Sequence, residues 1–571
     1  MMKPEKLNAL PRNRSQHWGG WLLLLFALAV VSYYILGPSR GFFTADCTDT
    51  IVWAQASLDA GRVFNPDFSY AALLPFGAGL WYVPLIWLFG YNLAVQQAGL
   101  LIFLALLTAA LLFIFHEAGL SFPRACSLTA AAILLLSASD KLREIFWGHV
   151  IYYSLSFLLL LIGAALLLRL EKLAGSPARR HMTFVVTAAA FFLLSAGAAT
   201  NGIQGLAMFH FPLVLGLFWL HRPQPGQTAS RSQAASPRAG SSPLARPFWF
   251  ELILGLASAA AGLLLLLYMR RGGISAPYAD AYSRLSAPSE WLSHIAVFPK
   301  RYFELLAVSL DPLVFPSVSD SLINLLRGLA ALILLLLPLW LFARFRRQSQ
   351  ALQFLLVLHA GMVLIIGSAF IFGQVSNAAW RLIPAVATGL LCCLFKLGEI
   401  SFSQAALQAA GGGFKAAAAA VLLAMMLASA GADAWTMLRL PYNYGQNNNL
   451  WQLTRALEAD GVARGYASFW QANSVTLLSG ETVQSRTVTI NESGVAIRTY
   501  QSILKWYQTS DPAAACFLVL TPQEKAALQQ SQEWQSLQPA MIRLYQAGDF
   551  TVMVFDQDLW QLIEPVYDSQ G

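Results

Sequence analysis

Long apolar runs separated by short polar segments dominate the first 431 residues of the chain. A helix that crosses a bilayer needs about 20 mainly apolar residues. Runs of this kind lie near residues 18–36, 73–90, 93–115, 124–139, 150–170, 182–199, 203–220, 248–268, 321–343, 352–372, 381–397 and 413–431. The pattern predicts an α-helical polytopic membrane protein whose first run, which lacks a small-residue cleavage site, stays as an uncleaved helix.

Positive charges indicate how many of these runs cross the membrane, because cytoplasmic loops are enriched in Lys and Arg. Counting all twelve from a cytoplasmic N-terminus would place three consecutive basic loops outside: EKLAGSPARRH, the 221–247 loop and RFRRQ. Leaving out the run at 73–90 places all three inside. That run contains Pro75, Pro84, three glycines and two tryptophans, which suits a re-entrant or interfacial hairpin. We therefore expect about eleven spans, with a first outer loop at 37–92 and the C-terminus outside.

The chain changes character in two places. Residues 222–247, rich in Pro, Ser, Gly and Ala, predict a disordered cytoplasmic loop. After residue 431, the amphipathic segment LWQLTRALEADG is followed by short strand-like segments: RTVTI, CFLVL and TVMVF. We expect a membrane domain over residues 1–431 and a small extracytoplasmic α/β domain over residues 432–571.

The composition excludes several classes of protein. The chain is 57% hydrophobic and only 12% charged, whereas soluble domains are about a quarter charged. The net charge of +8 comes from Lys and Arg between apolar blocks, not from a basic groove, so we expect no nucleic-acid partner. No nucleophile motif and no phosphate-cradling Gly-rich loop is present. The five cysteines have no metal-type spacing, and a disulfide between Cys47 and Cys516 stays open as an alternative.

Two carboxylates follow the first apolar run directly, in the stretch GFFTADCTDT. Asp46 is placed to cap the helix-like run DTIVWAQASLDAG, and Asp49 lies in its first turn, where the helix dipole favours an acid. Capping does not exclude function. A rigid, ionised carboxylate also suits a general base or a metal ligand.

A second charged segment, SASDKLREIFWGH, lies at the predicted outer edge of the membrane. It contains Asp140, Lys141, Arg143, Glu144 and His149. One interpretation is a solvated linker between two helix ends. The other is that Asp140, Glu144 and His149 help to bind an acceptor or a divalent cation such as Mg²⁺ or Mn²⁺, which prefers oxygen ligands. The sequence specifies no cofactor with certainty.

Basic residues near the predicted outer surface are suited to binding a lipid phosphate. Arg381 opens a span in SNAAWRLIPAVATG, and Arg301 lies in the long aromatic loop 269–320. A guanidinium above the acyl region can hold a phosphate through two parallel hydrogen bonds, although an interfacial arginine that only snorkels is the alternative. Asn201 and Gln204, in ATNGIQG, are more typical of a turn than of a ligand site.

The order of these features resembles the GT-C superfamily of membrane glycosyltransferases, including the dolichyl-phosphate-mannose protein mannosyltransferases and bacterial relatives that use polyprenyl-phosphate sugars. The matching segments are FFTADCTDTIVWAQASLDAGRVFNPDFSY, LLPFGAGLWYVPL, SDKLREIFWGH and WRLIP, within about residues 18 to 431. The resemblance implies that Asp46, or less surely Asp49, is the catalytic base and that Arg381 contacts the donor phosphate. The sequence departs from the family in its D-x-x-D spacing and in Leu382, which stands where an aromatic residue is common.

The resemblance implies an inverting hexosyltransferase, in a bacterial inner membrane, with a polyprenyl-phosphate sugar as donor. The acceptor is a glycolipid, a polysaccharide or a protein. Three alternatives stay open: a lipid-linked-sugar flippase or transporter, a glycan ligase or polymerase, and a membrane scaffold. The rim position of the charges and the lack of a visible repeat favour the enzyme over a transporter.

Overall fold

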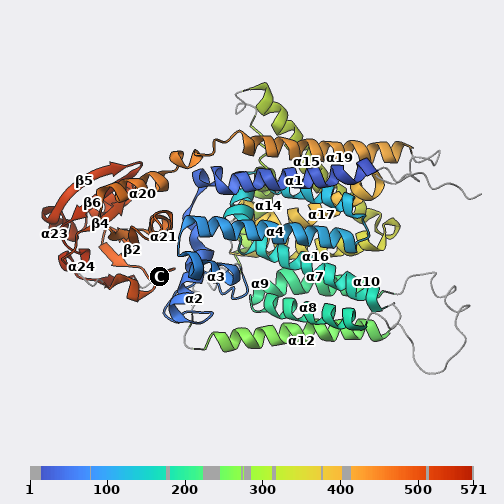
Figure 1. Cartoon of the computed structure of the whole chain (residues 1–571), viewed down its shortest axis with the longest axis horizontal. Coiled ribbons are helices and arrows are strands. Elements are labelled where there is room, and N and C mark those ends of the chain that lie inside the picture. The colour runs from blue at the N-terminus through green and yellow to red at the C-terminus, as the bar shows by residue number, and fades with distance from the viewer. Residues whose placement is uncertain are drawn as a thin grey trace, which may run out of the picture.

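The computed structural model describes residues 14–77, 79–174, 181–222, 245–271, 274, 284–311, 317–374, 377–401, 413–508 and 513–568. Figure 1 shows a bundle of long, nearly parallel helices and, beyond one end of it, a smaller domain built on a β-sheet. The loop predicted to be disordered at 222–247 falls almost entirely outside the described residues.

Ten helices in the described part of the chain are long and apolar enough to cross a membrane. They are α1 (Arg14–Leu36), α4 (Leu93–Glu117), α7 (Tyr153–Ala174), α8 (His181–Ala199), α9 (Ile203–Gly205) with η5 (Leu206–His210) and α10 (Phe211–Leu220), α12 (Ala245–Met269), α15 (Val318–Ala343), α16 (Gln350–Phe372), η9 (Ala379–Leu382) with α17 (Ile383–Ser401), and α19 (Gly413–Leu438).

The helix α5 (Phe122–Leu135) counts as an eleventh span when it is taken together with the elements that follow it. The short elements α6 (Asp140–Glu144) and η3 (Ile145–His149) follow it and turn away from its axis by 112°. The predicted count of about eleven spans is therefore confirmed. The bend also makes 140–149 a loop at the end of the bundle, and we call it the second loop.

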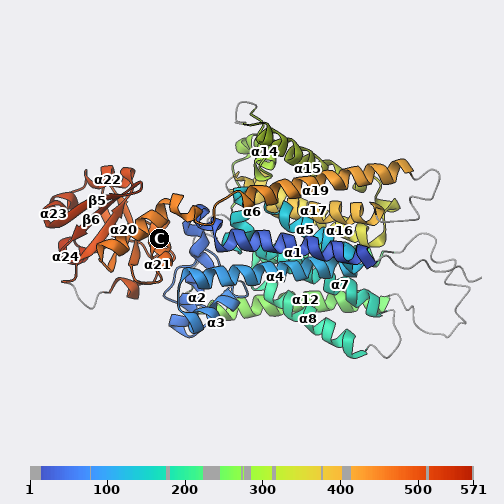
Figure 2. The same cartoon turned by 45° about the horizontal axis from the view of Figure 1, so that its top comes forward.

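The apolar run at 73–90 forms only the short helix α3 (Gly79–Phe89), with Pro84 inside it. At a rise of 1.5 Å per residue this helix covers about 16 Å, roughly half of a hydrocarbon core. It packs against α2 (Asp49–Ala60), and both lie at the end of the bundle that faces the sheet domain (Figures 1 and 2). The prediction that this run is not a straight spanning helix agrees with the structure.

The sheet domain has seven strands in the order β5-β6-β4-β1-β2-β3-β7. Their bounds are β1 Arg464–Ala467, β2 Gln484–Asn491, β3 Gly494–Ile497, β4 Cys516–Leu520, β5 Met541–Ala547, β6 Phe550–Phe555 and β7 Val566–Tyr567. β1 is parallel to both β2 and β4, whereas β6 is antiparallel to β4 and β5. The three predicted strands lie in β2, β4 and β6. The predicted helix is α20 (Asn449–Asp460), which ends at Gly461 in the left-handed conformation typical of helix ends.

The sheet domain packs directly against the end of the bundle. α21 (Phe469–Leu478) contacts η2 (Ala45–Thr48), and η10 (Tyr444–Asn447) contacts η1 (Pro38–Phe42). Side chains on one face of the sheet belong to the same buried cluster as the bundle core, among them Ala467, Phe517, Val519 and Val552. The opposite face forms a separate cluster around Tyr466, Leu518 and Met553. Because α19 continues to Leu438, the domain boundary at residue 431 stays a prediction.

Candidate active site

A cavity of about 470 Å³ lies where the end of the bundle meets the sheet domain, and we call it the catalytic cavity. Residues 37–92, which we call the first loop, form one wall. The other walls come from the second loop, the turn between α8 and α9, the end of α12, η9 and the sheet domain. The predicted residues Asp46, Asp49, Glu144, His149 and Arg381 all line it. Segments more than 300 residues apart in sequence therefore meet as the order of motifs predicts.

Asp46 lies on η2 and is partly exposed to the catalytic cavity. In the described part of the chain its carboxylate makes no hydrogen bond and no ion pair. The prediction that Asp46 caps the following helix is wrong, because neither η2 nor α2 has a side-chain cap. Its carboxylate is therefore free to accept a proton from a molecule in the cavity.

Asp49, in the first turn of α2, has a different environment although it lies only three residues away. Its side chain is 5% exposed. One oxygen accepts a hydrogen bond from His149 Nε2 (3.1 Å), and the other accepts one from Gln501 Nε2 (2.7 Å). Asp49 therefore joins the first loop to the second loop and to the sheet domain.

The Asp49–His149 pair retains a proton strongly. Burial raises the pKa of Asp49, and the hydrogen bond from His149 offsets this only in part. Burial lowers the pKa of His149, but the carboxylates of Asp49, Asp46 and Glu144 outweigh it and raise that pKa overall. Both directions favour a shared proton on the pair. Asp49 is thus poorly suited to take up a further proton, whereas the Asp46 carboxylate is partly exposed to the cavity and has no partner among the described residues.

The second loop divides its charges between the cavity and the surface. Lys141 and Glu144 form an ion pair (2.5 Å) that lines the cavity, and Lys141 lies 4.8 Å from the centre of the Trp380 ring. Asp140 pairs instead with Arg143, and its side chain is 66% exposed. The structure therefore brings Glu144 and His149 together in the site but leaves Asp140 outside its walls.

Of the two arginines predicted to bind phosphate, only Arg381 lines the cavity. Arg381 lies on η9, at the start of α17, and its Nη1 donates to the Tyr153 hydroxyl (2.7 Å). Arg301 lies on α14 (Trp291–Leu305), where it pairs with Glu304 (2.7 Å), and it does not line the cavity. A different basic side chain, Arg270 at the end of α12, lines the cavity instead. Its sequence signal is a basic pair directly after a span.

Several residues that line the cavity were not predicted as site residues from the sequence. Asn201 and Gln204 do lie at a turn, as predicted, but they also line the cavity. The buried Asn201 Oδ1 has no hydrogen-bond partner among the described residues. Tyr500 reaches the cavity from the sheet domain. Its neighbour Gln501 is 1% exposed and accepts from the Trp53 indole N–H (2.8 Å) while donating to Asp49. No motif in the tail points to these contacts.

Several non-glycine residues near the same cavity have a strained backbone with positive φ. In the described part of the chain, five non-glycine residues have positive φ, and Val150 (43°), Tyr152 (52°) and Gln501 (53°) are three of them. Such conformations cost about 1–3 kcal/mol each and persist where the surrounding structure holds them. Here they orient the two segments that contact Asp49 and line the catalytic cavity.

A metal-type cluster lies elsewhere. Among the described residues, Glu171, His221 and Glu251 are the group of three whose ligand atoms lie within 4.8 Å of one another. They come from the end of α7, the residue after α10 and the start of α12, at the end of the bundle remote from the sheet domain. The predicted set of Asp140, Glu144 and His149 does not converge in this way.

The fold is that of an integral membrane protein in which a bundle of spanning helices carries a sheet domain at one end, and the candidate site lies where the two meet. No family model and no curated protein matches the chain. The crystal structure of ArnT from Cupriavidus metallidurans in the apo state is 13% identical, with a TM-score of 0.52 over 96% of this chain and 99% of that chain. Because the match covers nearly all of both chains, the likeness of fold includes the bundle and the sheet domain.

Two other solved structures are similar over much of the chain. ArnT from the same organism bound to undecaprenyl phosphate has a TM-score of 0.47 at 13% identity, over 96% of this chain and 99% of that one. The Archaeoglobus fulgidus oligosaccharyltransferase in the apo form has a TM-score of 0.44 at 12% identity, over 82% of this chain and 65% of that one.

Proposed function

We propose that the protein is an inverting glycosyltransferase that moves a hexose from a polyprenyl-phosphate sugar to an acceptor hydroxyl at the outer face of a bacterial inner membrane. One observation carries the proposal: the unpartnered carboxylate of Asp46 and the guanidinium of Arg381 line the same cavity. A base for the attacking hydroxyl and a cation for the departing phosphate are the two groups that a direct displacement needs. The GT-C-like fold supports it.

In the proposed reaction the polyprenyl chain lies among the helices and the sugar lies in the catalytic cavity. Asp46 takes the proton from the acceptor hydroxyl as its oxygen attacks the anomeric carbon. The bond from that carbon to the phosphate oxygen breaks, and its electron pair leaves with the lipid phosphate. Arg381, held by Tyr153, stabilises the charge on that phosphate, and Arg270 adds a second cation. A single displacement inverts the anomeric configuration.

Asp49 acts in this proposal as a positioning residue. Its contacts with His149 and Gln501 fix the start of α2, and Asp46 lies one turn earlier in the same loop. The acidic residues in the cavity do not form a converging ligand set, so no step is assigned to a divalent cation. Transfer measured with and without EDTA tests the Mg²⁺ or Mn²⁺ that the sequence allows.

The test is sugar transfer by the purified full chain, with a panel of polyprenyl-phosphate hexoses as donors and a bacterial glycolipid extract as the acceptor mixture. We expect Asp46→Asn and Arg381→Ala each to lower the rate by about 100-fold or more. Asp556→Asn and Arg301→Ala are the matched controls, because Asp556 is exposed and Arg301 lies outside the cavity. Both controls should keep the wild-type rate.

Two outcomes would overturn the proposal. If Asp46→Asn transfers sugar at the wild-type rate, the base is another group. If no donor supports transfer while the protein moves lipid-linked sugar across vesicle membranes, the flippase alternative is correct.

A further inference from the structure

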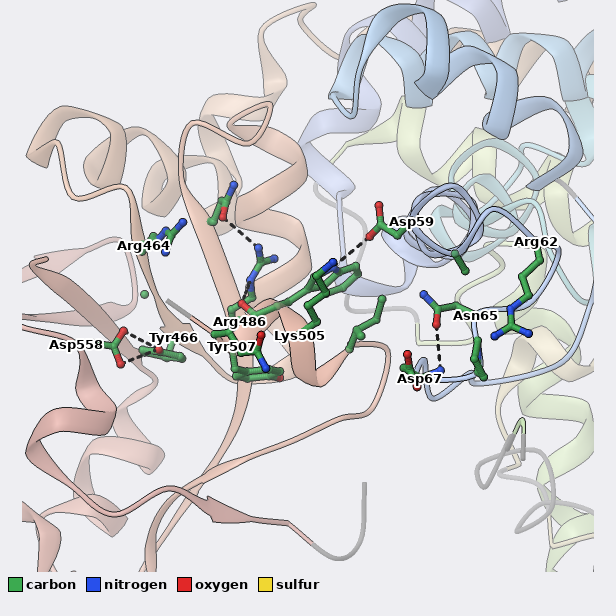
Figure 3. A pocket seen from close by; sticks show the side chains of 17 residues that line it. Asp59, Arg62, Asn65, Asp67, Arg464, Tyr466, Arg486, Lys505, Tyr507 and Asp558 are labelled. Carbon is green, nitrogen blue, oxygen red and sulfur yellow. Dashed lines mark hydrogen bonds between the residues drawn. The ribbon is translucent and has the colours of Figure 1, made fainter. Parts of the chain in front are cut away.

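A second cavity, of about 530 Å³, lies between the sheet domain and the first loop, and we call it the junction cavity. One wall is the end of α2 and the loop after it, with Asp59, Arg62 and Asn65. The other wall is formed by β1, β2 and η11 (Leu504–Tyr507) of the sheet domain. Figure 3 shows Lys505 and Arg486 on the sheet-domain side facing the first-loop side, where Arg62 lies.

The strand pairing builds a polar platform at this cavity. In the parallel ladder, Arg464 pairs with Gln484 and Tyr466 pairs with Arg486. Residues two apart on a strand, and residues paired across two strands, lie on the same face of the sheet. All four therefore share one face and line the junction cavity. β1 and β2 are interior strands, so ligand recognition here depends on side chains, not on the addition of a peptide strand.

Three of the four basic side chains that line this cavity, those of Arg62, Arg486 and Lys505, make no ion pair with a described residue. Arg486 donates from Nε to the Trp506 carbonyl (3.0 Å) and from Nη2 to Gln484 Oε1 (3.1 Å), and both acceptors are neutral. Burial lowers the pKa of Arg486, as expected for a cation taken partly out of water. Arg62 and Lys505 are exposed, and within the described residues their side chains make no ion pair or hydrogen bond. The site therefore presents three cations to a bound anion.

Three carboxylates also line the cavity, and two of them accept hydrogen bonds from neutral donors, which leave their negative charge in place. Asp558 accepts hydrogen bonds from the Tyr466 hydroxyl (2.9 Å) and from the Trp560 backbone N–H (3.1 Å). Asp59 accepts one from the Trp506 indole (3.2 Å). Asp67 is the remaining carboxylate, and it lies exposed in the first loop. Aromatic rings of Tyr466, Trp506 and Tyr507 complete walls that combine apolar surface with hydrogen-bonding groups, as in small-ligand sites of this size.

We propose that the junction cavity binds an anionic carbohydrate, a sugar that carries a phosphate or a carboxylate group, and that this sugar is a part of the acceptor outside the catalytic cavity. Guanidinium and ammonium groups pair with the anion, while the aromatic and amide side chains contact the sugar ring and its hydroxyls. This inference rests on the proposed function and names the chemical class of its acceptor.

The position of the junction cavity favours the acceptor over the lipid-linked donor. The segment from Tyr500 to Ile503 separates the two cavities: Tyr500 lines the catalytic cavity and Ile503 lines the junction cavity. Two isolated β-bridges, Phe68 to Ile503 and Ser69 to Tyr500, attach this segment to the first loop. The junction cavity is thus made by the sheet domain and a loop, with no wall from a spanning helix that a polyprenyl chain would contact.

The test begins with binding to the full chain in nanodiscs, measured by calorimetry without donor. The probes are a galacturonic acid disaccharide, glucose 6-phosphate, inorganic phosphate and neutral maltose. We expect both anionic sugars to bind at least tenfold more tightly than maltose and than inorganic phosphate. The double variant Arg62→Gln/Lys505→Gln should lose at least tenfold of this affinity. Arg455→Gln/Lys525→Gln, which removes the same charge elsewhere on the sheet domain, should not.

Transfer provides the second arm. The Arg62→Gln/Lys505→Gln variant should raise KM for an acceptor that carries an anionic sugar by about tenfold, with kcat unchanged, and should leave transfer to a neutral acceptor intact. Equal affinity for maltose and the anionic sugars, or undiminished affinity in this variant, would overturn the inference. So would binding seen only with vesicles of anionic lipid. Failure of the proposed function looks different, because wild-type transfer is then absent from every donor whatever the binding result.

Discussion

The two ends of the helical bundle gather the same kinds of side chain and differ in what surrounds them. At the end near the sheet domain, Asp49 pairs with His149 beside a cavity of about 470 Å³ into which Asp46 projects without a partner. At the other end, His221 lies between Glu171 (2.5 Å) and Glu251 (3.1 Å). Each end thus has a histidine that pairs with a carboxylate, and the first end adds Asp46, whose carboxylate has no partner among the described residues.

Under the proposed function, this difference separates a reactive site from a structural contact. The Glu171–His221–Glu251 cluster joins three helices, and each of its charges faces another member of the cluster. The hydrogen bond between Asp49 and His149 connects the first loop to the second loop in a similar way, but both residues also line the catalytic cavity. The paired buried carboxylates hold segments together at both ends, and the proposed function assigns the chemistry to Asp46, which has no partner among the described residues.

The largest effect should come from removing the free carboxylate. We expect Asp46→Asn to lower the transfer rate by about 1,000-fold while the thermal unfolding transition in detergent shifts little, because no hydrogen bond or ion pair is lost in the described structure. Measuring both quantities on one preparation tests the comparison. A large loss of stability with Asp46→Asn would show that Asp46 also stabilises the fold.

Breaking the cluster at the other end should have the opposite effect. His221→Ala leaves two carboxylates close together without their cation, so we expect about 3 kcal/mol of destabilisation. The transfer rate per folded molecule should stay within about twofold of wild type. Chemical denaturation followed by transfer assays of the folded fraction checks this, with Glu290→Ala, an exposed acid, as the control.

The number of membrane spans was accessible from sequence because its cause is local. Whether a run is long and apolar enough to span depends on about 20 consecutive residues. The run at 73–90 was separable because of its own prolines and the positive charges of the later loops. The sheet was harder to predict. The four-residue β1 and the two-residue β7 carry little pattern of their own and are held by pairing with distant partners.

The candidate site was predictable only where a residue's chemistry follows from its own segment. Asp46 and Arg381 stand at helix ends, where a charge is conspicuous in a membrane protein. Asp140 also lies at a helix end, but it pairs with Arg143 one turn later and does not line the cavity. Gln501 had no signal because its partners, Asp49 and Trp53, lie more than 400 residues away.

Gln501 offers a sharper test of the end near the sheet domain. Gln501→Ala removes the hydrogen bonds to Asp49 and Trp53, so we expect about 2 kcal/mol of destabilisation. If Gln501 positions the first loop, kcat should fall about tenfold with little change in KM. Gln501→Gly loses the same bonds but relieves the positive φ, so it should be as slow as the alanine variant and more stable. An unchanged kcat in both variants would leave Gln501 with a structural role alone.

The smallest expected effect is the pH dependence of the Asp49–His149 pair. The folded-state pKa of His149 is raised, so the folded protein binds its proton more tightly than the unfolded chain. The stability that this proton gives is fully present below the unfolded pKa of about 6.5 and is lost as the pH rises through the raised value. Relative to His149→Gln, wild-type protein should therefore have the higher free energy of unfolding at pH 6. This advantage should shrink by pH 9 in thermal unfolding scans. An advantage that grows with pH would mean that the buried histidine is neutral in the folded state, and Asp49 would then be an anion held by Gln501 and a neutral imidazole.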